Sequence, residues 1–120
     1  MIGVGGFFGA ISRFVIGYGV QKITPWAEMP MGTLAVNLLG CFLIGLLSQF
    51  SVAMVTIETR SLIFVGFLGS LTTFSTFSNE TLLLSQKGLT GLSVLNLILQ
   101  VSLGLFAVWG GQVVGQVVQS

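Results

Sequence analysis

The sequence contains no histidine, a single cysteine (Cys41) and two prolines, and only 6% of its 120 residues are charged. Without histidine, we expect neither a histidine proton relay nor a structural zinc site. One cysteine cannot form a disulfide within the chain. Soluble domains have about 25% charged residues, so four basic and three acidic side chains are too few to cover a water-soluble surface.

Apolar residues dominate instead, at 53% of the chain with a mean hydropathy of +1.03. In lipid, about 20 consecutive apolar residues span as a helix, because the backbone must satisfy its own hydrogen bonds. The runs predict an all-α integral membrane protein with four spans, at about residues 2–20, 32–54, 62–84 and 89–118. Residues 1–120 then form one membrane unit, with no removable signal peptide expected. No soluble domain is left to host an enzyme or a nucleic-acid partner.

The basic residues outside the span centres give only a weak orientation signal. Four spans place both termini on the side of Arg60, whereas Lys22 and Lys87 lie in loops on the opposite side. Loops with more Lys and Arg normally stay in the cytoplasm. The small difference fits either one weakly specified orientation or insertion both ways, with antiparallel pairing of two copies.

Polar residues inside the first two spans have two interpretations each. Arg13 is costly within a membrane, so its guanidinium either reaches the interface or faces a water-filled vestibule that attracts anions. Thr33 and Asn37 are four residues apart and share one helix face. An intramembrane asparagine either holds helices together or lines a polar path.

The third span contains the unusual stretch "GFLGSLTTFSTF" at residues 66–77. Its small and hydroxyl residues fit either a close helix–helix contact or a break in the helix, where hydroxyls satisfy freed backbone groups. Phe74 and Phe77 favour the break, since two rings on one face would hold a partner helix away. Ring edges have partial positive charge, so this pair could meet a small anion.

Two further polar features complete the pattern. Glu80 lies one turn after Thr76 and is the only acidic residue expected within a span, towards one end. In the fourth span Asn96, Gln100 and Gly104 follow each other at four-residue spacing, which puts another polar stripe on one face.

Together these motifs resemble the small bacterial fluoride channels, the Fluc or CrcB family. The similarity runs in order through "GAISRF", "GTLAVNLLG" and the distinctive "GFLGSLTTFSTFSNE", and is loose in the fourth span. It implies a fluoride-selective channel that exports fluoride passively across the bacterial cytoplasmic membrane and so reduces fluoride toxicity. It also implies an antiparallel, dual-topology dimer with a broken third helix.

The resemblance also implies roles for individual residues. The backbone carbonyls of Gly69 and Thr72 would hold a structural sodium ion at the dimer interface. Phe74 and Phe77 would be the paired anion-facing rings, and Asn37 the pore-lining amide. The remaining expected pathway residues are Arg13, Thr33, Ser75, Thr76 and Glu80. Members of the family often have Tyr and Ser where this chain has Asn96 and Gln100, which leaves open whether it pairs with itself or with a sister chain.

Two other functions compete with the channel. A four-helix, proton-coupled exporter of cationic drugs would need a carboxylate inside the membrane. Here Glu28, Glu58 and Glu80 avoid the predicted span centres. An accessory packing subunit would explain the glycines, but neither the phenylalanine pair nor the polar stripes.

Overall fold

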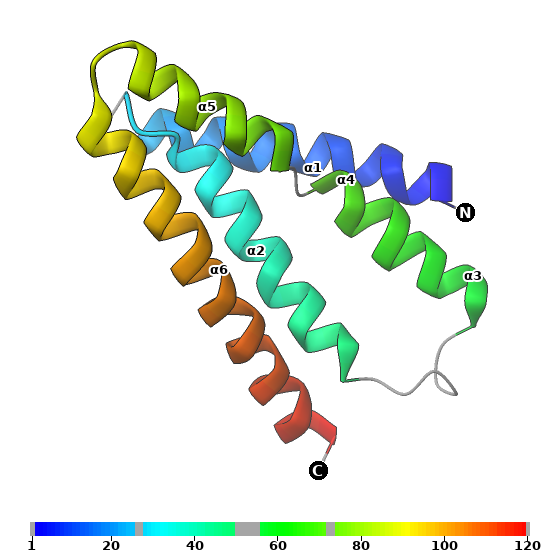
Figure 1. Ribbon diagram of the computed structural model, residues 1–120. Coiled ribbons are helices and arrows are strands. Elements are labelled where there is room, and N and C mark those ends of the chain that lie inside the picture. Colours follow the sequence, from blue (N-terminus) through cyan, green and yellow to red (C-terminus); the bar gives the residue numbers. More distant parts are fainter. Residues whose placement is uncertain (1, 26–27, 50–55, 72–73, 120) are drawn as a thin grey trace.

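The computed structural model describes residues 2–25, 28–49, 56–71 and 74–119 (Figure 1). These residues are almost entirely helical and include no strand. Four helical segments in the described residues are long and apolar enough to cross a membrane. The predicted all-α membrane protein with four spans is therefore confirmed. Thr72, one of the two expected sodium ligands, lies outside the described residues.

The helix bounds differ from the predicted spans mainly at their ends. The first, second and fourth spans are α1 (Ile2–Ile23), α2 (Met31–Ser48) and α6 (Thr90–Gln119). The predicted end of the second span, residue 54, lies outside the described residues. The third span consists of α3 (Ile57–Arg60), η2 (Ser61–Leu68), α4 (Gly69–Leu71) and α5 (Phe74–Gln86). It starts before the predicted residue 62 because the polar turn at Ile57–Arg60 is already helical.

The first half of the third span packs against α1. Its segment η2 is a π-helix, a wider winding with i→i+5 hydrogen bonds that is usually short and often occurs near functional sites. The approach is close because two α1 glycines face it. A β-carbon at Gly5 would overlap the carbonyl of Leu62, and one at Gly9 the carbonyl of Phe67. Small residues of this kind let membrane helices approach backbone to backbone.

The second span packs along the fourth, and the two helices run side by side in Figure 1. Glycines again set the distance between them. A β-carbon at Gly45 would overlap the carbonyl of Val108, and one at Gly111 the carbonyl of Phe42. The α2–α6 pair and the α1–η2 pair meet where Gly17 of α1 lies against Gly32 of α2. Because the two pairs diverge from this crossing, space remains between α2 and the third span.

The side chain of Gln21 fixes that crossing by capping α2. Its Oε1 accepts the backbone N–H of Gly32 at 3.0 Å, and its Nε2 donates to the carbonyl of Met29 at 3.0 Å. The first N–H groups of a helix have no partner inside the helix. A glutamine from the end of α1 supplies one here, so the end of α1 is tied to the start of α2.

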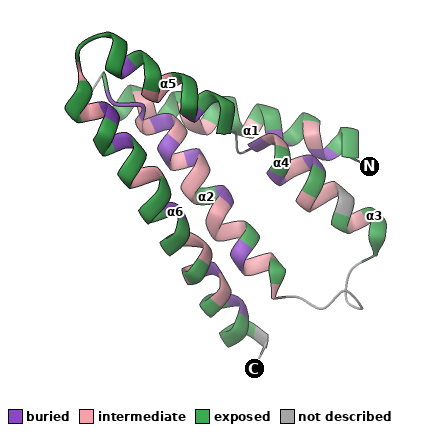
Figure 2. Cartoon of the chain, in the orientation of Figure 1, coloured by how far each residue is buried: buried purple, intermediate pink, exposed green. Residues whose placement is uncertain are grey.

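Most of the surface is apolar, as a lipid-facing protein requires. Figure 2 shows exposed residues along α1, α5 and α6, and buried ones where helices meet. Phe14, Phe106 and Val117 are among the exposed large side chains. The small buried core contains Val36, Leu68 and Leu71.

Replacing Gly111 by alanine is expected to loosen the α2–α6 contact. The added methyl group has no room against Phe42, and overpacking of this kind costs about 1–3 kcal/mol. Thermal unfolding in detergent micelles, followed by circular dichroism, measures the loss. The matched control is Gly110→Ala, because a β-carbon at Gly110 meets nothing within 4 Å. Equal unfolding temperatures for both variants would contradict this account of the packing.

Candidate functional site

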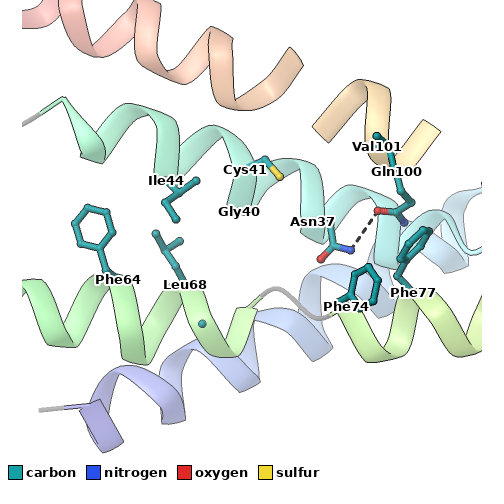
Figure 3. Close-up of a pocket in the computed structure, with 11 residues that line it drawn as sticks. Asn37, Gly40, Cys41, Ile44, Phe64, Leu68, Phe74, Phe77, Gln100 and Val101 are labelled. Carbon is teal, nitrogen blue, oxygen red and sulfur yellow. Dashed lines mark hydrogen bonds between the residues drawn. The ribbon is translucent and has the colours of Figure 1, made fainter. Parts of the chain in front are cut away.

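A cavity of about 410 Å³ lies between α2, the third span and α6 (Figure 3). At one end, the amides of Asn37 and Gln100 lie beside the rings of Phe74 and Phe77. The other end is apolar and is lined by residues that include Ile44, Phe64 and Leu68. No charged side chain lines it among the described residues. The divergence of the two helix pairs thus leaves a neutral space inside the bundle, with amide groups on one side.

Phe74 and Phe77 come from the first turn of α5 and touch each other. Their ring centroids are 5.7 Å apart with planes at 61°, an edge-on arrangement. Phe77 is 7% exposed and packed, whereas Phe74 is 78% exposed. Both rings also line a second cavity of about 410 Å³, whose polar lining is Ser78, Thr81, Ser85 and Ser93. The ring pair therefore lies between a space lined by amides and a space lined by hydroxyls.

Asn37 occupies a similar position on the other side of the first cavity. It also lines a third cavity, of about 250 Å³, together with Arg13, Thr33 and Thr76. The three cavities are therefore neighbours that share lining residues, in the order Arg13, Asn37, phenylalanine pair and α5 hydroxyls. Arg13 is exposed, and no carboxylate among the described residues pairs with it. Its positive charge is available at that end.

Two hydrogen bonds join α2 to its neighbours across this region. The Asn37 amide Nδ2 donates to Oε1 of Gln100 on α6 at 3.2 Å. The Thr33 hydroxyl donates to Oε1 of Glu80 on α5 at 2.6 Å. Thr33 and Asn37 share a helix face, as predicted, yet they bond to different helices. The carboxylate of Glu80 is half-buried and held by a hydroxyl, with no basic partner among the described residues.

Asn96 lies deeper, between α5 and α6, and is fully buried at 0% exposure. Its Nδ2 donates to the Thr81 hydroxyl at 2.9 Å, and that hydroxyl donates to the carbonyl of Phe77 at 2.8 Å. The Ser93 hydroxyl donates to the carbonyl of Thr81 at 2.8 Å. This network ties α6 to the backbone of the helix that carries both phenylalanines. Asn96 thus supports the site from behind instead of lining it.

The other expected site residues lie nearby with different exposure. Gly69 is exposed and lines the first cavity, at the start of the short helix α4. Ser75 is exposed on α5 but lines none of the three cavities. The described residues contain no cluster of three or more acidic, cysteine or histidine side chains for a metal.

Sequence reasoning missed the roles of Thr81 and Ser93. The spacing of these residues was a signal. Ser93 and Asn96 are three residues apart and share one face of α6, and Phe77 and Thr81 are four residues apart and share one face of α5. Neither stands out as a motif, because hydroxyl residues are tolerated throughout membrane helices. The stripe of Asn96 and Gln100 was recognised, but the sequence does not show that one residue packs and the other lines a cavity.

The fold and the site together define a helical membrane protein of four spans with a polar route between its helices. Residues 1–112 match the family described as "CrcB-like protein, Camphor Resistance (CrcB)". The chain belongs to this family, and the resemblance seen in its motifs is confirmed.

Relatives with an assigned name match the chain over most of its length. It is 51% identical over 102 residues to the "Fluoride-specific ion channel FluC" of Nitratiruptor sp., covering 85% of this chain and 79% of the relative. The protein of the same name from Campylobacter lari is 50% identical over 111 residues, covering 92% and 90%. That from Sulfurovum sp. is 47% identical over 106 residues, covering 88% and 83%.

The Asn96–Thr81 hydrogen bond is expected to couple α5 and α6 energetically. Asn96→Leu and Thr81→Val should each destabilise the fold, and the double variant should lose less than the sum. Interhelical hydrogen bonds in membranes are worth about 0.6 to 1.7 kcal/mol in such cycles. Chemical unfolding in mixed micelles gives the four free energies. Thr90→Val, an exposed change at the start of α6, is the control and should be neutral; additive losses would show that the pair is not coupled.

Proposed function

We propose that this chain is a subunit of a fluoride-specific ion channel, which lets fluoride leave the cell passively. The observation that carries the proposal is the identity of 51% to a named fluoride channel, over 85% of this chain. The comparisons lend nothing to the cation-exporter alternative.

The three cavities supply a physical route for a small anion. Arg13 would raise the local anion concentration at one end. Amides of Asn37 and Gln100 and the edges of Phe74 and Phe77 would then replace water around the ion. The hydroxyls of Thr33, Ser75 and Thr76 and the carboxyl of Glu80 would complete the polar surroundings. Fluoride is small and accepts strong hydrogen bonds, whereas the larger chloride would fit these donors poorly.

The complete channel is proposed to be an antiparallel dimer of this chain in a bacterial cytoplasmic membrane. Its weak charge asymmetry agrees with insertion in both orientations. Two copies related by a two-fold axis in the membrane would bring their mid-span surfaces together. The exposed Gly69 and the open cavity beside it lie on such a surface. A sister chain in place of the second copy would give the same arrangement.

We propose that the third helix breaks near Gly69 and that a structural sodium ion binds there. Hard cations in membrane proteins are coordinated by backbone carbonyls at unwound helix ends. Gly69 is in the short helix α4 and Thr72 follows that helix in the sequence, so their carbonyls would supply such an end. One chain contributes only these two carbonyls, so a symmetric second copy would double the ligand set. The ion would join the two subunits and needs no acidic ligand.

Fluoride efflux from liposomes that contain the purified protein tests the function. Fluoride should leave rapidly while chloride stays inside, and replacing sodium by a large organic cation should lower the flux. Equal leakage of both anions, or retention of both, would refute the channel.

Phe74→Ile is expected to reduce fluoride flux by up to about tenfold, because ring-edge contacts of this kind are worth up to about 1.5 kcal/mol. The control is Phe106→Ile on α6. Phe106 is also exposed and also pairs edge-on with a ring, that of Trp109 at 5.7 Å, but it lies outside the three cavities. A similar loss in both variants would point to a general effect of losing an aromatic residue.

Dual topology is tested by cysteine labelling in sealed vesicles. In a Cys41→Ala background, Lys87→Cys places one thiol in the exposed loop between α5 and α6. A membrane-impermeant maleimide should label about half of the chains if the two orientations are equally populated. Labelling of all chains, or of none, would mean a single orientation.

A further inference from the structure

The outward face of α1 carries three exposed side chains that line none of the three cavities described above. Phe14, Tyr18 and Lys22 follow each other at four-residue spacing and therefore share one helix face. Phe14 is 71% exposed, Tyr18 is 61% exposed, and Lys22 is exposed as well. The opposite face of the helix meets η2 at Gly5 and Gly9. The three side chains thus point away from the bundle, on a helix that Figure 2 shows to be largely exposed.

These side chains also contact one another. The rings of Phe14 and Tyr18 are stacked, with centroids 6.0 Å apart and planes at 9°. The Nζ atom of Lys22 lies over the Tyr18 ring, 5.9 Å from its centroid. The face of an aromatic ring attracts a cation, so this contact holds the ammonium group against the helix. The result is a continuous apolar ring surface that ends in a positive charge.

The length of α1 places this charge at the level of the lipid headgroups. The helix has 22 residues, and Lys22 is in its last turn. At a rise of 1.5 Å per residue the helix is about 33 Å long, close to the roughly 30 Å thickness of the hydrocarbon core. Tyrosine is common at this membrane level. The rings therefore lie beside acyl chains, while the ammonium group lies beside headgroups.

Lys22 has no carboxylate partner among the described residues. Helix α1 contains no acidic residue, and Glu28 in the loop that follows it pairs instead with Lys87 at 3.8 Å. A basic side chain at the membrane surface attracts anionic lipids. In a zwitterionic headgroup the lipid's own ammonium offsets its phosphate, whereas phosphatidylglycerol leaves the charge of the phosphate uncompensated. The charge of Lys22 therefore favours an anionic lipid over a zwitterionic one.

We propose that the face of α1 formed by Phe14, Tyr18 and Lys22 binds a phospholipid with an anionic headgroup. The ammonium group of Lys22 pairs with the lipid phosphate, and an acyl chain of the same lipid lies along the two stacked rings. This inference requires only the membrane fold, so it holds whether or not the chain conducts fluoride.

Lipid bound on this face is expected to stabilise the junction of the first two spans. Gln21, next to Lys22 in the sequence, ties the end of α1 to the start of α2 through its bonds to Met29 and Gly32. A ligand that binds the folded protein alone raises its stability by mass action. The unfolding temperature should therefore rise when anionic lipid is added.

Native mass spectrometry of the purified protein, released from micelles that contain added lipid, measures the binding. The first molecule of dioleoylphosphatidylglycerol should bind about fivefold more tightly than the first molecule of dioleoylphosphatidylcholine, as expected for one lysine at an anionic membrane surface. Lys22→Gln should abolish this preference because it removes the charge. Lys22→Arg should keep the preference because it retains the charge.

The matched control is Lys87→Gln. Lys87 is also exposed, but its charge is paired with that of Glu28, so its loss should leave the lipid preference unchanged. Circular dichroism checks that each variant is folded. Thermal unfolding gives a second readout, since phosphatidylglycerol should raise the unfolding temperature of the unmodified chain and of Lys87→Gln, but not that of Lys22→Gln. Soluble glycerol phosphate, which has the anion without acyl chains, should not displace the lipid at equal concentration.

Three outcomes would overturn the proposal. Equal affinities for the two lipids, or an unchanged preference in Lys22→Gln, would show that Lys22 does not select an anionic headgroup. Loss of the preference in both Lys22→Gln and Lys87→Gln would indicate a general effect of surface charge. Displacement by glycerol phosphate would show that the site takes a free anion and that the rings contribute nothing. The fluoride efflux assay tests the channel function separately from all three.

Discussion

The whole structure depends on the lack of water in the membrane interior, which obliges each polar group there to find its partner within the protein. The described spans contain amides, hydroxyls and carboxylates, and several of them bond to a neighbouring helix. Thr33 bonds to Glu80, Asn37 to Gln100, and Asn96 to Thr81. These bonds place the polar groups at helix interfaces, and the cavities follow from where those interfaces diverge. Two buried atoms, Oδ1 of Asn96 and Nε2 of Gln100, remain without a partner in the described part of the chain.

Glycine governs where the interfaces close, and polar residues govern where they stay open. At Gly45 and Gly111 the backbones of α2 and α6 touch, and at Gly5 and Gly9 those of α1 and η2 do. Between these contacts, Asn37, Gln100, Phe74 and Phe77 line the space that α2, α5 and α6 leave open. A helix bundle with few charges can therefore hold a cavity without a rigid scaffold of ion pairs. Among the described residues the one ion pair, between Lys87 and Glu28 at 3.8 Å, lies in exposed loops and contributes little to stability.

Much of the fold was readable from the sequence, because hydropathy and length decide which segments cross a membrane. The α1 and α6 spans end within a few residues of their predicted limits. The π-helical winding of Ser61–Leu68 was not predicted, since no residue type specifies it and packing against the α1 glycines is not visible in a linear pattern. In the site, the spacing of Phe74 and Phe77 predicted a shared face, and the rings do touch. Phe77 is buried and Phe74 exposed because of how α6 packs against α5. The spacing of residues within α5 does not show that packing.

The polar stripe of the fourth span shows how a substitution can change a site without changing its polarity. Asn96 and Gln100 are one helical turn apart, yet they serve different interfaces. Asn96 reaches α5 through Thr81, whose hydroxyl bonds to the Phe77 carbonyl. Gln100 reaches across to α2 and faces the cavity. Since an amide has both a donor and an acceptor, bonding one end to the protein necessarily directs the other. A hydroxyl, which rotates freely, imposes no such direction. The amide of Gln100 therefore makes the polar lining of this chain more directional than a serine hydroxyl would.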